Sequence, residues 1–453
     1  MLIKNREILL EVSNPKTREI RRRMLDLLEI ALQSINVSEL LSKSMIFNKI
    51  PNFDDYNNIY VLGFGKASGG MAEQIEKILG ATNITDGIVI VPKIIKQTIN
   101  VQKIKILEAD HPIPSRTNIE ASNHLINVIK EIPKKNSLIF ILISGGGSAL
   151  LTLPYEGIKL EDISNLTELL LNCGADIKEI NIVRKHIGKF KGGKLVKKLY
   201  PAKIISFLIS DVGKYPPEFI ASGPTYPDQS TYQNAMDILK KYSILEQTPT
   251  SIIDNFKKGI RGEIPENPSE NDPCFSKTEN IIVGNLKNAC KAVYDYANKH
   301  NITPYIYPKF IEGEARDIGK KLIDLANEIY VTVPKFGKPL LFIAGGETTV
   351  TVKGSGKGGR CQELILGSIE KLENFKQAVM LAIGTDGIDG NSDAAGAIID
   401  NNSFLIANNM GLKVENYLNN NDSYTFFKEL RHNLIFTGPT GTNVSDLVLL
   451  LLN

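Results

Sequence analysis

Short, unbroken apolar runs mark this chain, and most of them end in a polar corner rich in glycine. The clearest runs are residues 59–62, 139–143, 204–209, 340–344 and 379–383. Because they do not alternate with polar positions, these runs predict strands that are buried on both faces, as in parallel sheets covered by helices. Runs near 280–284, 303–307 and 348–352 predict further strands of a second set.

Helical spacing appears near the N-terminus, where we predict a helix over residues 14–35. Asn14 can cap this helix and Pro15 suits its first turn. Apolar side chains then recur at every third or fourth position, which forms one buried stripe. Residues 226–278 are polar and rich in proline, which predicts a connection between domains with helices near 231–260.

The order of strands and helices predicts an α/β fold with two α/β domains around a central cleft. Residues 46–235 are expected to form a Rossmann-like domain with a parallel sheet. Residues 236–453 are expected to form a smaller C-terminal α/β domain, on which a helical segment, residues 1–45, can pack. Polar corners fall in both halves, so we expect the site in the cleft.

Composition narrows the function classes. The chain has 453 residues, 42% of them hydrophobic and 23% charged, which is typical of a soluble globular protein. A net charge of +3 gives no electrostatic case for a nucleic-acid partner, and no run approaches the ~18 apolar residues of a membrane span. The four cysteines are scattered without a CxxC pair, and the N-terminus lacks a signal pattern, so we expect reduced thiols in the cytoplasm.

The corners after the first strands carry candidate anion-binding groups. Ligands bind at the carboxyl ends of strands in open α/β sheets. Lys66 follows one such strand among glycines, where it can point into a cleft. The loop Ser144, Gly145, Gly146, Gly147, Ser148 lies between a predicted strand and a predicted helix start, which favours an anion on backbone N–H groups over a simple tight turn. Asp211, at the end of its own strand, is a candidate metal ligand or general base.

A nicotinamide site is disfavoured by the same region. Gly63 and Gly65 begin a GxG pattern after a strand, but Ser68 occupies the place of the third glycine. No acidic residue follows at the end of a second strand at the expected spacing, apart from Asp86 in a turn.

The second half of the chain has a basic, glycine-rich loop at residues 353–360, which suits phosphates or carboxylates. Asp386, Asp389 and Asp393 cluster within eight residues, and they suit either Mg²⁺ or turn and helix-cap chemistry, which spacing leaves open. Residues 181–194 form a basic helix and glycine turn that either faces solvent or faces an anion. Residues 438–446 offer hydroxyls and an amide for a polar ligand, or for turns.

Together these corners resemble the type II glycerate kinases, the MOFRL family, over nearly the whole chain. The resemblance rests on several motifs in order: Gly65-Lys66-Ala67, Asp110-His111-Pro112, Ser144 to Ala149, Asn181 to Gly193, Ser210-Asp211-Val212, Ala221 to Thr225, Gly345 to Val350, Gly356 to Arg360, Gln362-Glu363, Gly384 to Gly390, Asp393 to Ala397 and Gly438 to Asp446. The chain departs from the family pattern at Lys214, at Cys361 and at Asn391-Ser392.

The resemblance implies two α/β domains around a deep cleft and transfer of the γ-phosphoryl group of ATP to D-glycerate with Mg²⁺, most members giving 2-phosphoglycerate. It implies that Lys66 and Arg360 are the key active-site cations. With Asp211, these are the expected catalytic residues, and Asp386 and Asp389 are the expected metal ligands. Expected substrate- and phosphate-binding residues are Ser144, Gly145, Gly146, Gly147, Ser148, Glu347, Lys357 and Asn443.

The expected partners are therefore D-glycerate and ATP, with no nucleic acid and no membrane, and we expect a homodimer. An NAD(P)H-dependent hydroxypyruvate reductase is the alternative enzyme, since its substrate is similar. A binding protein without catalytic activity is a third class, but it would have to keep Lys66, Arg360 and three aspartates for binding alone.

Overall fold

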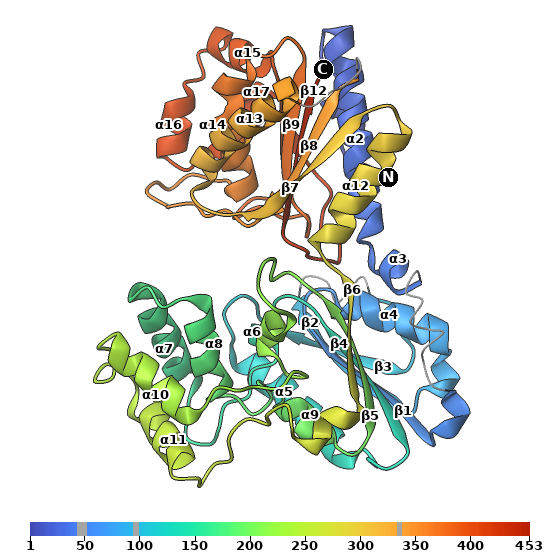
Figure 1. The fold of residues 1–453 in the computed structure, drawn as a ribbon, viewed down its shortest axis with the longest axis vertical. Helices are drawn as coiled ribbons and strands as arrows, with labels where there is room; N and C mark the ends of the chain where they lie inside the picture. The colour runs from blue at the N-terminus through green and yellow to red at the C-terminus, as the bar shows by residue number, and fades with distance from the viewer. Residues whose placement is uncertain (43–51, 94–98, 333–337) are drawn as a thin grey trace. The chain divides into compact units, whose positions relative to one another are not determined.

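The computed structural model describes residues 1–42, 52–93, 99–332 and 338–453 (Figure 1). The chain forms two compact units, and each has an α/β fold. One unit is continuous, Leu41–Val283. The other joins Met1–Leu40 to Gly284–Asn453.

The continuous unit is built on a largely parallel sheet in the order β3-β2-β1-β4-β5-β6. Its strands are β1 (Asn58–Phe64), β2 (Asp86–Pro92), β3 (Ile104–Ala109), β4 (Ser137–Ile143), β5 (Lys203–Ile209) and β6 (Thr278–Gly284). Neighbours from β3 to β5 pair in parallel. Every residue of β4 is buried, so the prediction of strands covered on both faces is confirmed here.

Helices cover both faces of this sheet and form a further layer beside it. The helices are α4 (Ser68–Leu79), α5 (Arg116–Glu131), α6 (Gly147–Leu150), α7 (Leu160–Asn172), α8 (Ile177–Lys185), α9 (Lys194–Leu199), α10 (Tyr232–Lys241) and α11 (Thr250–Ile260). Helices α5 and α9 share a core with alternate residues of β1 and β4. Helices α7, α8, α10 and α11 enclose a second core that includes Tyr232 and Phe256.

The discontinuous unit contains a mixed sheet in the order β11-β10-β9-β12-β8-β7. Its strands are β7 (Thr303–Ile311), β8 (Leu340–Gly346), β9 (Ala378–Gly384), β10 (Gly396–Asp400), β11 (Leu434–Ile435) and β12 (Asp446–Leu452). The runs at 340–344 and 379–383 are strands as predicted, but both are antiparallel to β12, which lies between them. They are still buried on both faces, because helices cover both sides of this sheet as well.

The helices of the discontinuous unit are α1 (Arg6–Leu9), α2 (Pro15–Ser34), α3 (Val37–Ser42), α12 (Leu286–Lys299), α13 (Ala315–Thr332), α14 (Arg360–Leu372), α15 (Ser403–Asn409), α16 (Val414–Asn419) and α17 (Ser423–Leu430). Helices α2 and α12 lie on one side of the sheet, and α13 and α14 lie on the other (Figure 1). The helix predicted over 14–35 is confirmed: the Asn14 side chain accepts hydrogen bonds from Lys16 N and Thr17 N.

Two features differ from the expectations. The prediction of a strand over 348–352 is wrong, since only Thr349 forms an isolated bridge, with Glu314, and Thr351 N donates to the Glu314 carboxylate instead of to a neighbouring strand.

The units divide after Val283, whereas we expected a boundary at 235 and 236. Residues 236–283 join the parallel-sheet unit because β6 lies beside β5 and α10 and α11 pack near α8. The other expected boundary, at 45 and 46, lies outside the described residues.

No helix in the described parts of the chain has both the length and the apolar character needed to cross a membrane.

Candidate active site

The carboxyl ends of β1 and β4 bring Lys66 and the Ser144–Ser148 loop together. The strands pair in parallel with Phe64 opposite Ile143, so both corners lie at one edge of the sheet. Lys66 N donates to Gly145 O at 2.9 Å, and Ala67 N donates to Ser144 Oγ at 2.9 Å. These hydrogen bonds join the two corners into one substructure, as the strand-end rule predicts.

Asp211 and His111 pack directly against the backbone of the same loop. An ideal Cβ built on Gly145 would lie 2.0 Å from Asp211 Oδ2, and one on Gly146 would lie 2.9 Å from His111 Nε2. Any side chain at Gly145 would therefore displace the Asp211 carboxylate. Asp211 follows β5, so three neighbouring strands of the sheet deliver Lys66, the glycine loop and Asp211 to one place.

Hydroxyl groups continue this cluster toward α8. Ser148 Oγ lies 2.8 Å from Ser222 Oγ, which donates to Asn181 Oδ1 at 2.9 Å. Ser222 has a φ of 62°, a left-handed backbone that brings its side chain back to the loop. Ser222 was not among the predicted site residues, because a serine in a turn carries no signal of its own.

In the discontinuous unit, Arg360 begins α14 and is held by two carboxylates. Its guanidinium donates to Asp446 through Nε at 2.5 Å and Nη2 at 2.9 Å, and its Nη1 lies 3.2 Å from Glu347 Oε1. Burial raises the pKa of Asp446 and the ion pair with Arg360 opposes that shift. The Arg360 side chain keeps 34% exposure, so the guanidinium has an open side where a ligand could bind.

Asp389 has contacts that differ from those of a metal ligand. Its carboxylate is 2% exposed and accepts hydrogen bonds from Cys361 N at 3.1 Å, from Gln362 N at 2.8 Å and from the Gln362 side chain at 2.9 Å. Cys361 and Gln362 are in the first turn of α14, where N–H groups lack partners within the helix. Of the two alternatives that spacing left open, these contacts favour helix capping for Asp389.

Asp386 lies on the turn after β9 and is partly buried. Its Oδ1 accepts a hydrogen bond from Ile388 N at 3.3 Å. Among the described residues, no three His, Cys, Asp or Glu side chains gather as a ready-made metal site. This donor set fits Mg²⁺ only in the usual manner of nucleotide enzymes, in which one or two carboxylates are completed by phosphate oxygens and water.

Lys357 and Asn443, both expected to bind substrate, have local partners. Lys357 Nζ lies 3.0 Å from the exposed Asp393 carboxylate and 3.9 Å from the centre of the Tyr424 ring. Asp393 raises the pKa of Lys357. Asn443 Oδ1 accepts from Ser445 N at 3.1 Å, which is a turn contact. Tyr424 was not predicted, because its position over Lys357 depends on the fold of α17.

A cavity of about 540 Å³ opens beside Arg360. Its lining residues are Glu347, Thr348, Thr349, Val350, Val352, Gly356, Gly358, Gly359, Arg360, Glu363, Gly390, Asn391 and Asn421. Its volume lies within the range of ~300–1,000 Å³ that is common for small-molecule sites. Two valines give the cavity an apolar wall, and Arg360 with the glycines before it gives a basic one, which together suit a flat base with attached phosphates.

The chain is similar to proteins of one family. Residues 23–257 match the family described as domain of unknown function DUF4147, and residues 340–446 match the MOFRL family. A glycerate 2-kinase from Pyrococcus horikoshii is 39% identical over 92% of this chain and 92% of its own length. A protein from Agrobacterium vitis with a hydroxypyruvate reductase name is 33% identical, over 85% of this chain and 97% of its own length. The crystal structure of a glycerate kinase from Thermotoga maritima superimposes with a TM-score of 0.84 at 32% identity, covering 96% of this chain and 100% of that one.

Proposed function

Since the chain belongs to the glycerate kinase family, with DUF4147 and MOFRL regions in order, we propose that it transfers the γ-phosphoryl group of ATP to the 2-hydroxyl of D-glycerate. The observation that carries this proposal is the cluster of Lys66, the glycine loop and Asp211 at the carboxyl edge of β1, β4 and β5. A cation, backbone N–H groups and a carboxylate are the groups that phosphoryl transfer to a hydroxyl needs, because its main demands are positioning and charge neutralisation.

Each cluster has a separate task in this proposal. Lys66 and Arg360 neutralise charge that develops on the transferred group and the charge of the glycerate carboxylate. The Ser144–Ser148 loop cradles phosphate or carboxylate through its backbone, and Asp211 orients the attacking hydroxyl. Glu347 contacts Arg360 at 3.2 Å and can exchange that contact for substrate.

The nucleotide would occupy the cavity beside Arg360, with its base against Val350 and Val352 and its phosphates near Arg360. Lys357 does not line this cavity but belongs to the same loop, and it would add positive charge there. Asn443 would add a hydrogen bond to a polar group of a substrate. Asp386 would hold Mg²⁺, which when bound supplies positive charge to the phosphates. Asp389, also expected to bind the metal, would act indirectly by fixing the start of α14.

The alternative, reduction of hydroxypyruvate with NAD(P)H, has a relative's name in its favour, but residues 63–68 depart from the dinucleotide-binding pattern. Ser68 is the first residue of α4, and it replaces the glycine of the GxGxxG pattern. Its buried hydroxyl donates to Gly65 O at 2.7 Å, so the side chain that stands in place of this glycine is part of the turn itself.

The test is ATP-dependent turnover of D-glycerate with Mg²⁺, coupled through enolase and pyruvate kinase without phosphoglycerate mutase. A signal establishes 2-phosphoglycerate as the product. A signal that appears only after the mutase is added would place the phosphoryl group on the 3-hydroxyl. If both assays are silent and NADH is oxidised with hydroxypyruvate, the kinase proposal is wrong.

Cytoplasmic location and a homodimer also stay proposals. The four cysteines are free thiols, which supports a reducing compartment. Light scattering coupled to size-exclusion chromatography would test the dimer.

A further inference from the structure

Two cations near the glycine loop, Lys191 and Arg184, have no carboxylate partner among the residues that the structure describes. Lys191 is 7% exposed, and its Nζ donates to Ser148 O at 2.7 Å. Arg184, on α8, is partly buried. Within the described parts of the chain, no ion pair joins either residue to an Asp or Glu. Neither residue was among the expected site residues, although the basic segment 181–194 was left open as facing either solvent or an anion.

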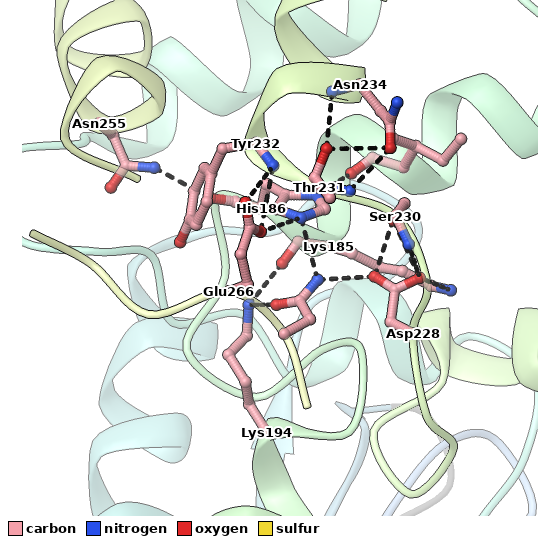
Figure 2. A network of polar contacts seen from close by, with 12 residues as sticks. Lys185, His186, Lys194, Asp228, Ser230, Thr231, Tyr232, Asn234, Asn255 and Glu266 are labelled. Atoms are coloured by element: carbon pink, nitrogen blue, oxygen red, sulfur yellow. Dashed lines mark hydrogen bonds and ion pairs between the residues drawn. The ribbon is translucent and has the colours of Figure 1, made fainter. Parts of the chain in front are cut away.

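Two other lysines of the same segment, Lys185 and Lys194, differ from Lys191 and Arg184 in being linked to a carboxylate. Figure 2 shows the network that surrounds Lys185, Lys194 and Asp228. Lys185 Nζ lies 3.3 Å from Asp228 Oδ1. Lys194 Nζ donates to Lys185 O at 2.6 Å and to Asn267 Oδ1 at 2.7 Å, and Asn267 Nδ2 donates to Asp228 Oδ2 at 2.6 Å. The other two buried lysines are thus tied to Asp228, directly or through an amide, whereas Lys191 and Arg184 are not.

Apart from its hydrogen bond to Ser148 O, Lys191 has an unfavourable electrostatic setting. Burial lowers the pKa of Lys191, and the positive charges of Arg184 and Lys194 lower it further. Burial also lowers the pKa of Arg184. Cations that are shielded from water and lack a carboxylate partner are costly in a folded protein, which points to a ligand that supplies the negative charge.

The backbone holds Lys191 against Ser148 and places Arg184 on the helix face that contacts Ser222. Gly192 N donates to Ser222 O at 3.0 Å and Gly193 N to Gly223 O at 2.8 Å, with φ values of 57° and 76° that glycine accommodates. This turn fixes Lys191 against the loop. On α8, Asn181 contacts Ser222, and Arg184 follows three residues later, so the two share a helix face.

We propose that Arg184 and Lys191 bind an oxyanion next to Ser148, either the carboxylate of the acid substrate or a phosphoryl group of the nucleotide. The assignment of the anion to a substrate rests on the proposed function. The guanidinium fork of Arg184 suits two oxygens at once, and the ammonium group of Lys191 adds a point charge from the loop side. Ser222 donates its single hydroxyl proton to Asn181, so Ser148 is the donor in its contact with Ser222, and its hydroxyl can turn to donate to the anion instead.

The experiment uses full-length Arg184→Gln and Lys191→Gln. Lys189→Gln is the matched control, because Lys189 lies in the same segment and faces the 98% exposed Glu156 at 3.6 Å. Inorganic phosphate, D-glycerate and ADP are titrated separately into each protein by calorimetry. We expect each site variant to lose affinity for at least one anion by about 10- to 100-fold, as for a lost charge-assisted hydrogen bond. The control should bind like the wild type.

The pattern of losses identifies the source of the anion. Loss for D-glycerate with ADP unchanged assigns the carboxylate, and loss for ADP with D-glycerate unchanged assigns a phosphoryl group. Affinities of both site variants that match the wild type for all three anions would overturn the proposal. So would a wild-type protein that binds none of them.

Thermal unfolding separates this role from a structural one. If Lys191 serves only to hold Ser148 O, Lys191→Gln should lower the melting temperature without anion and leave anion binding intact. If Lys191 binds a ligand, the melting temperature of Lys191→Gln without anion should equal or exceed that of the wild type. Phosphate should then fail to raise the melting temperature of the variant as it does that of the wild type. Because phosphate needs no turnover, this result stands even if the D-glycerate assay is silent.

Discussion

Arg360 contacts two carboxylates that differ in exposure, and this difference separates their roles. The Asp446 side chain is 4% exposed and binds the guanidinium with both oxygens, whereas Glu347 is 52% exposed and makes one contact. Asp446 therefore fixes the direction of Arg360, and Glu347 is the contact that a ligand can replace. A guanidinium held from behind loses little freedom when substrate binds in front.

If Arg360 has the proposed role of a transition-state cation, Asp446→Asn should lower kcat by on the order of 10²-fold, since a cation that loses its orientation loses part of its ~3 kcal/mol contribution. Glu347→Gln should change KM more than kcat. Steady-state kinetics with D-glycerate and ATP measure both. The control is Asp393→Asn, which removes the exposed partner of Lys357 and should leave kcat within about threefold. An Asp446→Asn enzyme with near-native kcat and a native melting curve would contradict this.

Single residues were predictable from the sequence where a corner follows an apolar run. Lys66, the Ser144–Ser148 loop and Asp211 each follow such a run, and the structure brings them together. Asp446 and Ser222 were not assigned roles, because their contacts depend on residues 86 and 41 or 74 positions away. A pattern read along the chain contains no information on such pairings.

At the scale of one element, α14 depends on a carboxylate outside it. Asp389 supplies the acceptors for the first N–H groups of this helix, and its burial raises its pKa while those hydrogen bonds oppose the shift. We predict that Asp389→Ala lowers the free energy of unfolding by on the order of 1–3 kcal/mol. Urea titration followed by circular dichroism measures this loss.

Asp386→Asn should behave in the opposite way. It should leave the free energy of unfolding within about 0.5 kcal/mol, as for a substitution away from the core, and raise the Mg²⁺ concentration needed for half-maximal activity. If instead Asp389→Asn changed the Mg²⁺ dependence without destabilising the protein, Asp389 would be a metal ligand and the capping interpretation would be wrong.

Helix α8 ends at a buried histidine that should make stability depend on pH. His186 is fully buried, its Nδ1 lies 2.8 Å from Ile182 O, and its ring packs edge-on to Tyr232 at 4.7 Å. Burial lowers the pKa of His186 to about 4 from 6.5; Lys194 lowers it too, while Asp228 opposes the shift. Below pH 6.5, His186 becomes protonated in the unfolded chain, but in the folded chain it stays neutral until about pH 4. The free energy of unfolding therefore falls as the pH falls through this window.

The expected loss is up to about 3 kcal/mol between pH 6.5 and pH 4, from the size of the shift. Urea unfolding of the wild type and of His186→Phe at several pH values isolates this contribution, because carboxylates elsewhere titrate in both proteins. The variant should be less stable at pH 7, having lost a hydrogen bond, but should lose less stability on acidification. If the free energy of unfolding of the wild type and of His186→Phe fell equally with pH, the acid sensitivity would belong to other groups.

Helices and strands were predictable where the sequence has a clear apolar pattern. Helical spacing of apolar residues predicted α2, and unbroken apolar runs predicted the buried strands. The failed strand at 348–352 has the β-branched composition of a strand, but Glu314 and Asn421 hydrogen bond to its backbone instead. The final run, residues 447–452, lies between β8 and β9 in the sheet and was not singled out. No polar, glycine-rich corner follows this run in the sequence, so the feature that marked the other strands is missing here.

At the scale of the whole molecule, the N-terminal residues belong to the unit formed by the last third of the chain. Helix α2 contributes the fully buried Met24, Leu27 and Leu28, and packs against α12, β9 and β12. Arg21 on this helix pairs with Asp400 at 2.6 Å, and both side chains are nearly inaccessible. By contrast, residues 41–283 form their own sheet and cores without any distant segment.

We therefore predict that residues 41–283 fold alone and that residues 284–453 do not. Removing α2 would leave Asp400 buried without its cation, which costs about 3–5 kcal/mol, and would expose the apolar face of β9 and β12. That loss is a large part of the ~5–15 kcal/mol that stabilises a typical domain. Adding a peptide of residues 1–40 should restore a cooperative melting transition to 284–453, and a peptide with Arg21→Gln should restore it poorly. A fragment 284–453 that melts cooperatively without the peptide would show that α2 covers this unit without being needed for its folding.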